Sequence, residues 1–332
     1  MTTAELTVPE VSDICKVVLD RVGSAVVGKH HELRLVLAAI LAGGHVLLED
    51  VPGIGKTLAA RSLAQTLGLR FSRIQFTPDL LPADVTGSFI YNQRTQEFDF
   101  RAGPVFTNLL LADEINRTPP RTQAALLEAM QEEQVTVEGE TNELEAPFIV
   151  LATANPIEYE GTYQLPEAQL DRFHLRVSFG YLDRDDEWQI LARRLERRQE
   201  RITLDAVTDA RGVLAMRAAV ERIPVEETVG RYIVDLTAAT RERPEVLVGA
   251  SPRGALSLML CARAFAVVNG REFVTPDDVK AVAVHALGHR LTLRPETYLK
   301  RTSGDNVILS VLEEVSVPPT AVVPRYIDPL GQ

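Results

Sequence analysis

The sequence predicts an α/β fold, a parallel sheet flanked by helices with β-hairpin insertions, followed by an all-α domain. Short apolar runs alternate with helical stretches from about residue 9 to residue 182, which is typical of a parallel sheet covered by helices. Beyond this point the apolar spacing becomes helical, with Trp188, Leu191 and Leu195 at i, i+3 and i+7. We therefore expect an α/β domain over residues 1–182, a helical domain over 183–315 and a proline-rich tail over 316–332.

Five β-rich runs are the candidate strands of the sheet: "HVLLE", "FSRIQF", "NLLLAD", "PFIVLAT" and "HLRVSF". In the second half of the chain, helices are expected near 226–242, 253–269 and 276–287, with no strand between them. Two segments alternate apolar and polar residues on either side of a polar turn, "TGSFIYNQRTQEFDFRAGP" and "EEQVTVEGETNELEAPF". This pattern predicts two β-hairpins inserted in the first domain.

Composition and charge indicate a globular protein and disfavour some classes of binding partner. The 332 residues are 45% hydrophobic, enough to bury a sizeable core, and the net charge of −11 repels a nucleic-acid polyanion. No apolar run reaches the roughly 20 residues of a membrane span, and the N-terminus lacks the basic and apolar segments of a secretory signal. We expect a cytoplasmic protein without membrane insertion or a nucleic-acid partner, with Cys15 and Cys261 as buried thiols.

The stretch "DVPGIGKT" has the composition and the context of a phosphate-binding loop. It follows the strand "HVLLE" and opens a helix, where glycines let backbone N–H groups close on an anion. Asp50 stands where the strict pattern has its first glycine, but this position starts the turn and its side chain can point away from the phosphates. We expect Lys56 to neutralise the β and γ phosphates of ATP and Thr57 to ligate Mg²⁺. The nucleotide-binding residues predicted for the loop are Pro52, Gly53, Ile54, Gly55, Lys56, Thr57 and Leu58.

Two adjacent carboxylates follow the apolar strand "NLLLAD", at the edge where open α/β sheets bind ligands. Asp113 would hold Mg²⁺ through water, and Glu114 would act as the general base for the water that attacks the γ-phosphate. Asn155 ends another buried strand and could orient the same water. An isolated acidic pair usually lies on the solvated surface, and an Asn at a strand end usually forms a turn. Here these residues follow buried strands downstream of the phosphate-binding loop, and this position favours the catalytic interpretation.

Four stretches that contain these motifs resemble the AAA+ ATPases and, within them, the MoxR family. They are "LLEDVPGIGKT", "IQFTPDLLPADVTG", "FDFRAGPVFTNLLLADEINRTPPRTQAALLEAMQE" and "LATANPIEYEGTYQLPEAQLDRF", which together cover most of residues 25–180. An aspartate at the position of Asp50 is usual in this family, whereas Ala154 stands where the family more often has Gln. The resemblance implies an AAA+ P-loop domain followed by an all-α lid, ATP/ADP and Mg²⁺ as cofactors, and a homo-oligomer in the form of a hexameric ring.

The resemblance also implies roles for residues outside the loop. Asn155 becomes the sensor 1 residue, and Arg172 becomes the arginine finger presented to the γ-phosphate of the neighbouring subunit. Arg253 matches sensor 2, and Val27 with Gly28 matches the segment that packs on adenine. With Lys56 and Glu114, the predicted catalytic set therefore includes Asn155 and Arg172.

Both arginines have a plainer interpretation. Arg172 follows Asp171 directly, and an isolated arginine beside an acid is usually a surface salt-bridge partner. Arg253 follows Ser251 and Pro252, which are good helix-start residues, so it could be a solvated arginine in a capping motif.

The two hairpins match, by the same resemblance, elements that face the centre of a ring and couple hydrolysis to a substrate. The first hairpin carries the aromatic residues Phe89, Tyr91, Phe98 and Phe100 near its strands. The alternative is that these rings simply pack against the domain, and the sequence does not separate the two.

Three functions follow from these residues. The first is a ring ATPase that remodels client proteins, in effect a chaperone in maturation or cofactor insertion, with a partner that contains a von Willebrand factor A domain; client and partner rest on the resemblance. The second is a nucleotide-gated binding module that switches partners with slow turnover. The third is a nucleic-acid motor, which is disfavoured because "VTVEGETNELE" is acidic and has no basic residue.

Overall fold

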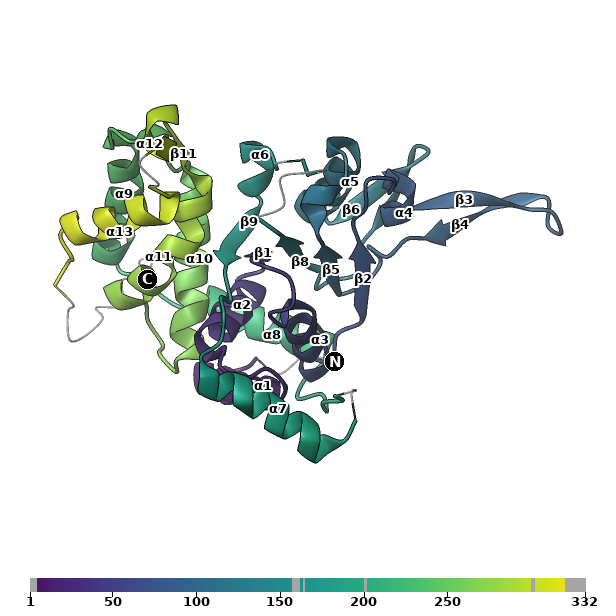
Figure 1. Ribbon diagram of the computed structural model, residues 1–332, viewed down its shortest axis with the longest axis horizontal. Coiled ribbons are helices and arrows are strands. Elements are labelled where there is room, and N and C mark those ends of the chain that lie inside the picture. Colours follow the sequence, from purple (N-terminus) through teal and green to yellow (C-terminus); the bar gives the residue numbers. More distant parts are fainter. Residues whose placement is uncertain (1–4, 157–161, 164, 200–201, 300–301, 320–332) are drawn as a thin grey trace, which may run out of the picture.

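The computed structural model describes residues 5–156, 162–163, 165–199, 202–299 and 302–319 (Figure 1). Its centre is a five-stranded sheet in the order β2-β5-β8-β1-β9, and every neighbouring pair is parallel. The α/β class and the five predicted strands are thereby confirmed. The strands are β1 (His45–Glu49), β2 (Phe71–Gln75), β5 (Leu109–Asp113), β8 (Ile149–Ala154) and β9 (Phe173–Val177).

The sheet separates two hydrophobic cores, because successive side chains of a strand point to opposite faces. On β1, Val46 and Leu48 belong to the core shared with α1, α2, α3 and the C-terminal helices, whereas Leu47 belongs to the core under α5. Both faces are therefore covered, which explains why the central strands β1, β5 and β8 read as nearly continuous apolar runs. The helices of this part are α1 (Val8–Ala25), α2 (His30–Leu41), α3 (Lys56–Thr66), α4 (Pro82–Thr86), α5 (Pro120–Glu132) and α6 (Glu167–Leu170), with a 3-10 turn η1 (Ile115–Arg117).

Both predicted hairpins are present, and the longer one projects away from the body of the molecule (Figure 1). Its aromatic residues form two cross-strand pairs, Phe89 with Phe100 and Tyr91 with Phe98, each with ring centroids 5.3 Å apart. The inner pair packs on the domain through Phe106, whereas Tyr91 is 50% and Phe98 66% exposed. Packing against the domain thus accounts for the inner pair, Phe89 and Phe100, and not for the outer pair, Tyr91 and Phe98. The hairpins consist of β3 (Gly87–Asn92) with β4 (Glu97–Ala102) and β6 (Gln134–Val137) with β7 (Glu140–Glu143).

The second half of the chain is helical, as predicted, with one difference. Two short strands pair antiparallel there, although no strand was expected. They are only two and three residues long, too short to show a periodic pattern. The elements are α7 (Arg184–Arg197), α8 (Ala210–Glu221), α9 (Glu227–Glu242), β10 (Val246–Val248), α10 (Pro252–Val268), α11 (Pro276–Leu287), η2 (Gly288–Arg290), β11 (Thr292–Leu293), α12 (Pro295–Leu299) and α13 (Gly304–Glu314). Of the predicted tail, residues 320–332 lie outside the described residues.

Helix α7 carries its apolar residues on an exposed side. The helix forms, but Trp188, Leu191 and Leu195 are each more than half exposed, and no residue of α7 is buried. It is attached at the edge of the molecule, where Arg193 donates to the carbonyl oxygens at the end of α1. Within the described residues, no helix is long and apolar enough to cross a membrane.

Candidate nucleotide-binding site

The loop between β1 and α3 has the backbone of a phosphate cradle. Gly53 and Gly55 have φ of +87° and +91°, which only glycine adopts readily, and Lys56 begins α3 directly after them. A β-carbon at either glycine would meet nothing within 4 Å, so this backbone borders open space. The N–H groups of the first turn of α3 have no partner within the helix, and this end of a helix favours an anion.

Asp50, the departure from the strict loop pattern, has a structural task. Its Oδ2 accepts hydrogen bonds from Gly180 N at 2.6 Å and Ser178 Oγ at 2.9 Å, and its Oδ1 accepts one from Val51 N at 2.9 Å. The carboxylate therefore points toward the segment that follows β9, and it is buried. Asp50 ties the start of the loop to that segment.

Lys56 points back across the loop, where its Nζ donates to the carbonyl oxygen of Asp50 at 2.6 Å. Burial lowers the pKa of Lys56 from its ordinary value, and the nearby carboxylates of Asp50, Asp113 and Glu114 oppose this shift. An anion bound in the loop would add to that opposition and stabilise the charged ammonium.

A pocket of about 410 Å³ opens beside the loop. It brings together nine of the predicted site residues, from the loop and from the ends of two strands. Three further lining residues, Arg73, Gln75 and Thr153, were not predicted. The lining consists of Pro52, Gly53, Gly55, Lys56, Thr57, Leu58, Arg73, Gln75, Asp113, Glu114, Thr153 and Asn155.

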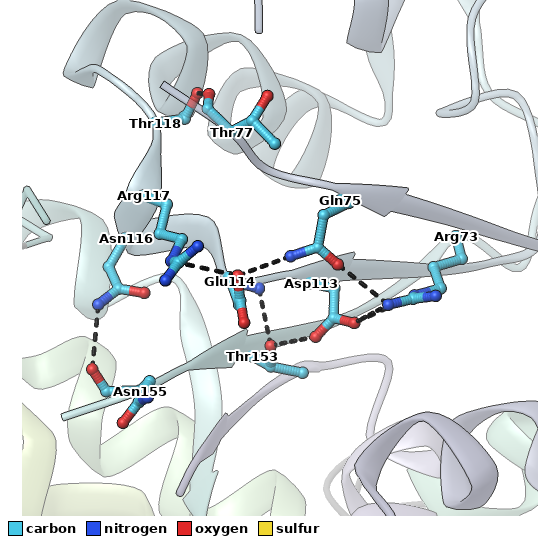
Figure 2. A network of polar contacts seen from close by, with 10 residues as sticks. All are labelled: Arg73, Gln75, Thr77, Asp113, Glu114, Asn116, Arg117, Thr118, Thr153 and Asn155. Atoms are coloured by element: carbon cyan, nitrogen blue, oxygen red, sulfur yellow. Dashed lines mark hydrogen bonds and ion pairs between the residues drawn. The ribbon is translucent and has the colours of Figure 1, made fainter. Parts of the chain in front are cut away.

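A threonine of the neighbouring strand β8 holds the Asp113 carboxylate and the backbone of Glu114 at the end of β5 (Figure 2). Thr153 Oγ1 donates to Asp113 Oδ1 at 2.6 Å and accepts from Glu114 N at 2.8 Å. Glu114 has a φ of +57°, which is uncommon for a residue with a β-carbon. The hydroxyl bridge therefore secures a backbone turn that directs the two carboxylates differently.

Each carboxylate is also engaged from β2 or from η1 (Figure 2). Arg73 donates to Asp113 Oδ2 from Nε at 3.0 Å and from Nη2 at 2.7 Å. Gln75 Nε2 donates to Glu114 Oε2 at 2.7 Å, and Arg117 forms an ion pair with the same oxygen at 3.3 Å. A water positioned by Glu114 would thus compete with Gln75 and Arg117 for that carboxylate.

A simple sequence signal could have found the missed residues. Arg73 and Gln75 are two apart on β2 and so share a face of the sheet, and Asn155 comes two residues after Thr153, directly beyond the end of β8. Asn155 is buried, lines the pocket and accepts from Asn116 Nδ2 through its carbonyl oxygen at 3.2 Å. Polar residues with period two at the carboxyl end of an apolar strand mark such an edge.

Three predicted binding residues do not line this pocket. Ile54 packs against the first core. Val27 is buried, and Gly28 has a φ of +71° and lies so close to Leu182 and Asp186 that a β-carbon would collide with both. The adenine-packing segment therefore lies against the chain that leads into α7, and its role stays a prediction.

The two predicted arginines also lie outside the pocket. Asp171, the expected salt-bridge partner of Arg172, pairs instead with Arg290, whose Nε is 2.7 Å from Asp171 Oδ1, so that plainer interpretation is wrong. Arg172 Nε has no hydrogen-bond partner among the described residues. Arg253 is exposed in the first turn of α10, which begins at Pro252 as expected but without a capping bond from Ser251. The catalytic and binding roles of both arginines stay predictions.

A parallel sheet with a glycine-rich loop after β1 and acidic residues at the end of β5 defines the chain as a P-loop nucleotide-binding protein. Comparison with known proteins narrows this class. The family model of the ATPase family associated with various cellular activities (AAA) matches residues 45–175, and that of the AAA lid domain matches residues 238–308.

Several relatives match over most of their length. The protein YeaC of Bacillus subtilis is 46% identical over 90% of this chain and 93% of its own, and Chaperone MoxR1 of Mycobacterium tuberculosis is 42% identical over 90% and 81%. A crystal structure of a candidate ATPase from Cytophaga hutchinsonii superimposes with a TM-score of 0.87 at 42% identity, over 93% of this chain and 96% of that one. The chain belongs to the MoxR family of AAA+ ATPases.

Proposed function

We propose that this ATPase is a ring motor that hydrolyses Mg-ATP and remodels client proteins. The observation that carries the proposal is that the predicted catalytic residues lie in two separate places. Lys56, Asp113, Glu114 and Asn155 line one pocket, whereas the guanidinium of Arg172 lies outside it. A site built in this way is completed by a second copy of the chain.

The pocket residues fit Mg-ATP by their chemistry. Lys56 and the N-terminus of α3 would hold the phosphates, and the Thr57 hydroxyl with Asp113 would hold the metal. The metal would neutralise phosphate charge and orient the nucleotide. Asp113 Oδ2 now accepts from Arg73, so metal binding there requires this guanidinium to turn aside.

Hydrolysis needs a base and a water held in line. Glu114 directly follows β5 and lines the pocket, where its carboxylate can accept the proton of a water, and the Asn155 amide can hold that water. Glu114 must first release Gln75 Nε2 and Arg117. These contacts also support a second candidate, a nucleotide-gated switch with slow turnover.

The ring follows from the arginines. An arginine supplied in trans stabilises the charge of the transition state, and a head-to-tail contact that uses different surfaces on each copy closes into a ring. We infer that Arg172 reaches the γ-phosphate of the neighbouring subunit, in a hexamer, and that Arg253 acts as the sensor 2 residue. The exposed Tyr91 and Phe98 of the long hairpin would then contact the client.

The biological setting rests on relatives. One relative is named a chaperone, which supports protein remodelling. Maturation or cofactor insertion of the client, and a partner with a von Willebrand factor A domain, are the setting that we propose from the family resemblance. A polyanionic client is not proposed, because the shorter hairpin carries Glu138, Glu140 and Glu143 and no basic residue.

The test measures size by light scattering together with the ATPase rate across protein concentrations, for the wild type and for Arg172→Ala. We expect the rate per subunit to rise with concentration as the ring forms, and Arg172→Ala to assemble without turnover. A monomer that hydrolyses ATP at a rate independent of concentration, unaffected by Arg172→Ala, would support the switch instead.

A further inference from the structure

Arg290, at the end of η2 in the lid, grips the backbone on both sides of Arg172. Its Nε donates to Asp171 Oδ1 at 2.7 Å, and its Nη2 donates to the carbonyl oxygens of Asp171 at 3.1 Å and Phe173 at 2.8 Å. The carbonyl groups of the residues before and after Arg172 are thus joined to one guanidinium. The contacts span more than 100 residues of sequence.

The grip is built into the lid. The Arg290 side chain is 2% exposed, and its Nη2 also donates to Ser257 Oγ on α10 at 2.9 Å. Burial lowers the pKa of Arg290, while the hydrogen bond and charge of Asp171 raise it. A buried guanidinium is tolerated only when its N–H groups are satisfied, so these acceptors fix its position. His289 adds a second lid contact, from Nε2 to the carbonyl oxygen of Phe173 at 3.0 Å.

Arg172 is held by its backbone rather than through Nε. Its Nε is buried without a hydrogen-bond partner among the described residues, and its backbone N donates to the carbonyl oxygen of Gln169 at 3.2 Å. The contacts of its neighbours Asp171 and Phe173 therefore also set its position. Those neighbours are fixed to two different bodies. Phe173 pairs with His45 at the edge of the sheet, and both Asp171 and Phe173 are fixed to the lid.

We propose that Arg290 is a positioning residue, which sets where the lid of one subunit presents Arg172 to the nucleotide of the next. The proposal rests on the proposed function, since it requires Arg172 to act in trans. Because Phe173 also stays paired with His45, a lid that moves relative to its sheet would shift Asp171 against Phe173 and so reorient Arg172 between them. Turnover in one subunit is then sensitive to the lid position of its neighbour, through residues that touch no nucleotide.

The test is complementation in mixed rings. Glu114→Gln subunits have an intact Arg172 and a site that cannot hydrolyse, whereas Arg290→Met subunits have an intact site and a displaced Arg172. Arg290→Met alone should lose roughly 10² in rate, the cost of a misplacement of about 1 Å. In an equal mixture, half the sites are competent and half of these face an intact neighbour, so about a quarter of the wild-type rate should return.

Two controls separate positioning from folding. Arg263→Met removes another lid arginine, 18% exposed and paired with Glu221 at 3.0 Å, and should keep the wild-type rate. Asp171→Asn weakens the same grip from the acceptor side, and it should lose about tenfold in rate by itself and recover in the mixture. ATP affinity should be unchanged in Arg290→Met and Asp171→Asn, since neither residue lines the pocket.

Mixtures of Glu114→Gln with Arg172→Ala test the underlying function. If these recover activity and neither the Arg290→Met nor the Asp171→Asn mixture does, Arg290 is a structural residue only and the inference is overturned. If the Arg172→Ala mixture also stays inactive, the shared site itself fails and the positioning role fails with it.

Discussion

The nucleotide pocket and the Arg172 segment are built in opposite ways. In the pocket, the functional side chains are tied to one another: Asp113 to Thr153 and Arg73, and Glu114 to Gln75. Around Arg172, the backbone is tied down while the functional side chain is left with an Nε that contacts no acceptor among the described residues. The difference indicates that the polar contacts of the pocket must rearrange when nucleotide binds, and it fits the proposal that Arg172 serves a ligand outside its own chain.

The largest expected effect is the loss of turnover in Arg172→Ala. An arginine supplied in trans is worth roughly 10³ to 10⁵ in rate, and Arg172 does not line the pocket of its own chain. ATP affinity, measured by calorimetry, should therefore be preserved while the ATPase rate falls. Equal losses in ATP affinity and ATPase rate would place Arg172 in the nucleotide pocket of its own chain and remove the difference between the two regions.

Glu114→Gln should break the pocket without touching the Arg172 segment. Loss of a positioned general base costs roughly 10² to 10⁴ in rate, and the amide can still accept a hydrogen bond from Gln75. The variant should bind ATP and hold it, as a single-turnover assay would show. An ATPase rate close to that of the wild type would refute Glu114 as the base.

Asp50→Gly sharpens the comparison, since it restores the usual loop glycine. Gly180 N and Ser178 Oγ would lose their acceptor, so we expect the free energy of unfolding to fall by about 1–3 kcal/mol. Asp50→Asn, which keeps one acceptor oxygen, should lose less. Chemical denaturation of the three proteins measures this order, and an Asp50→Gly protein as stable as the wild type would contradict the tie.

The smallest effect is expected in the long hairpin. Phe98→Ala removes an exposed ring and should leave both the basal ATPase rate and the melting temperature unchanged. Phe100→Ala, on the same strand, removes a ring that contacts Phe89 and Phe106, and should cost about 1 kcal/mol of stability. A fall in basal ATPase rate for Phe98→Ala would show that the outer pair supports the site itself.

Sequence patterns predicted the elements whose signals are local. The strands read as apolar runs, the loop showed its glycines beside Lys56 and Thr57, and the hairpins showed alternation. The site residues and contacts that were not predicted depend on pairing between distant segments. Gln75 and Thr153 matter only because their strands lie beside β5, and Asp171 carries no sign that its partner is Arg290, 119 residues away.

The exposure of one side of α7 could not be predicted from the sequence for a related reason. Helical spacing shows that Trp188, Leu191 and Leu195 share a side, but it does not show whether anything covers that side. Position in the fold decides, and α7 lies at the edge of the molecule (Figure 1).

Strand β9 connects the two regions. It begins at Phe173, beside Arg172, and the segment after its end is bonded to Asp50 at the start of the phosphate loop. Its five residues span about 17 Å, and a strand paired along its length changes little in length. The phosphate loop and Arg172, which we propose acts on the next subunit, therefore lie at the two ends of one strand, so a displacement at either end is transmitted to the other.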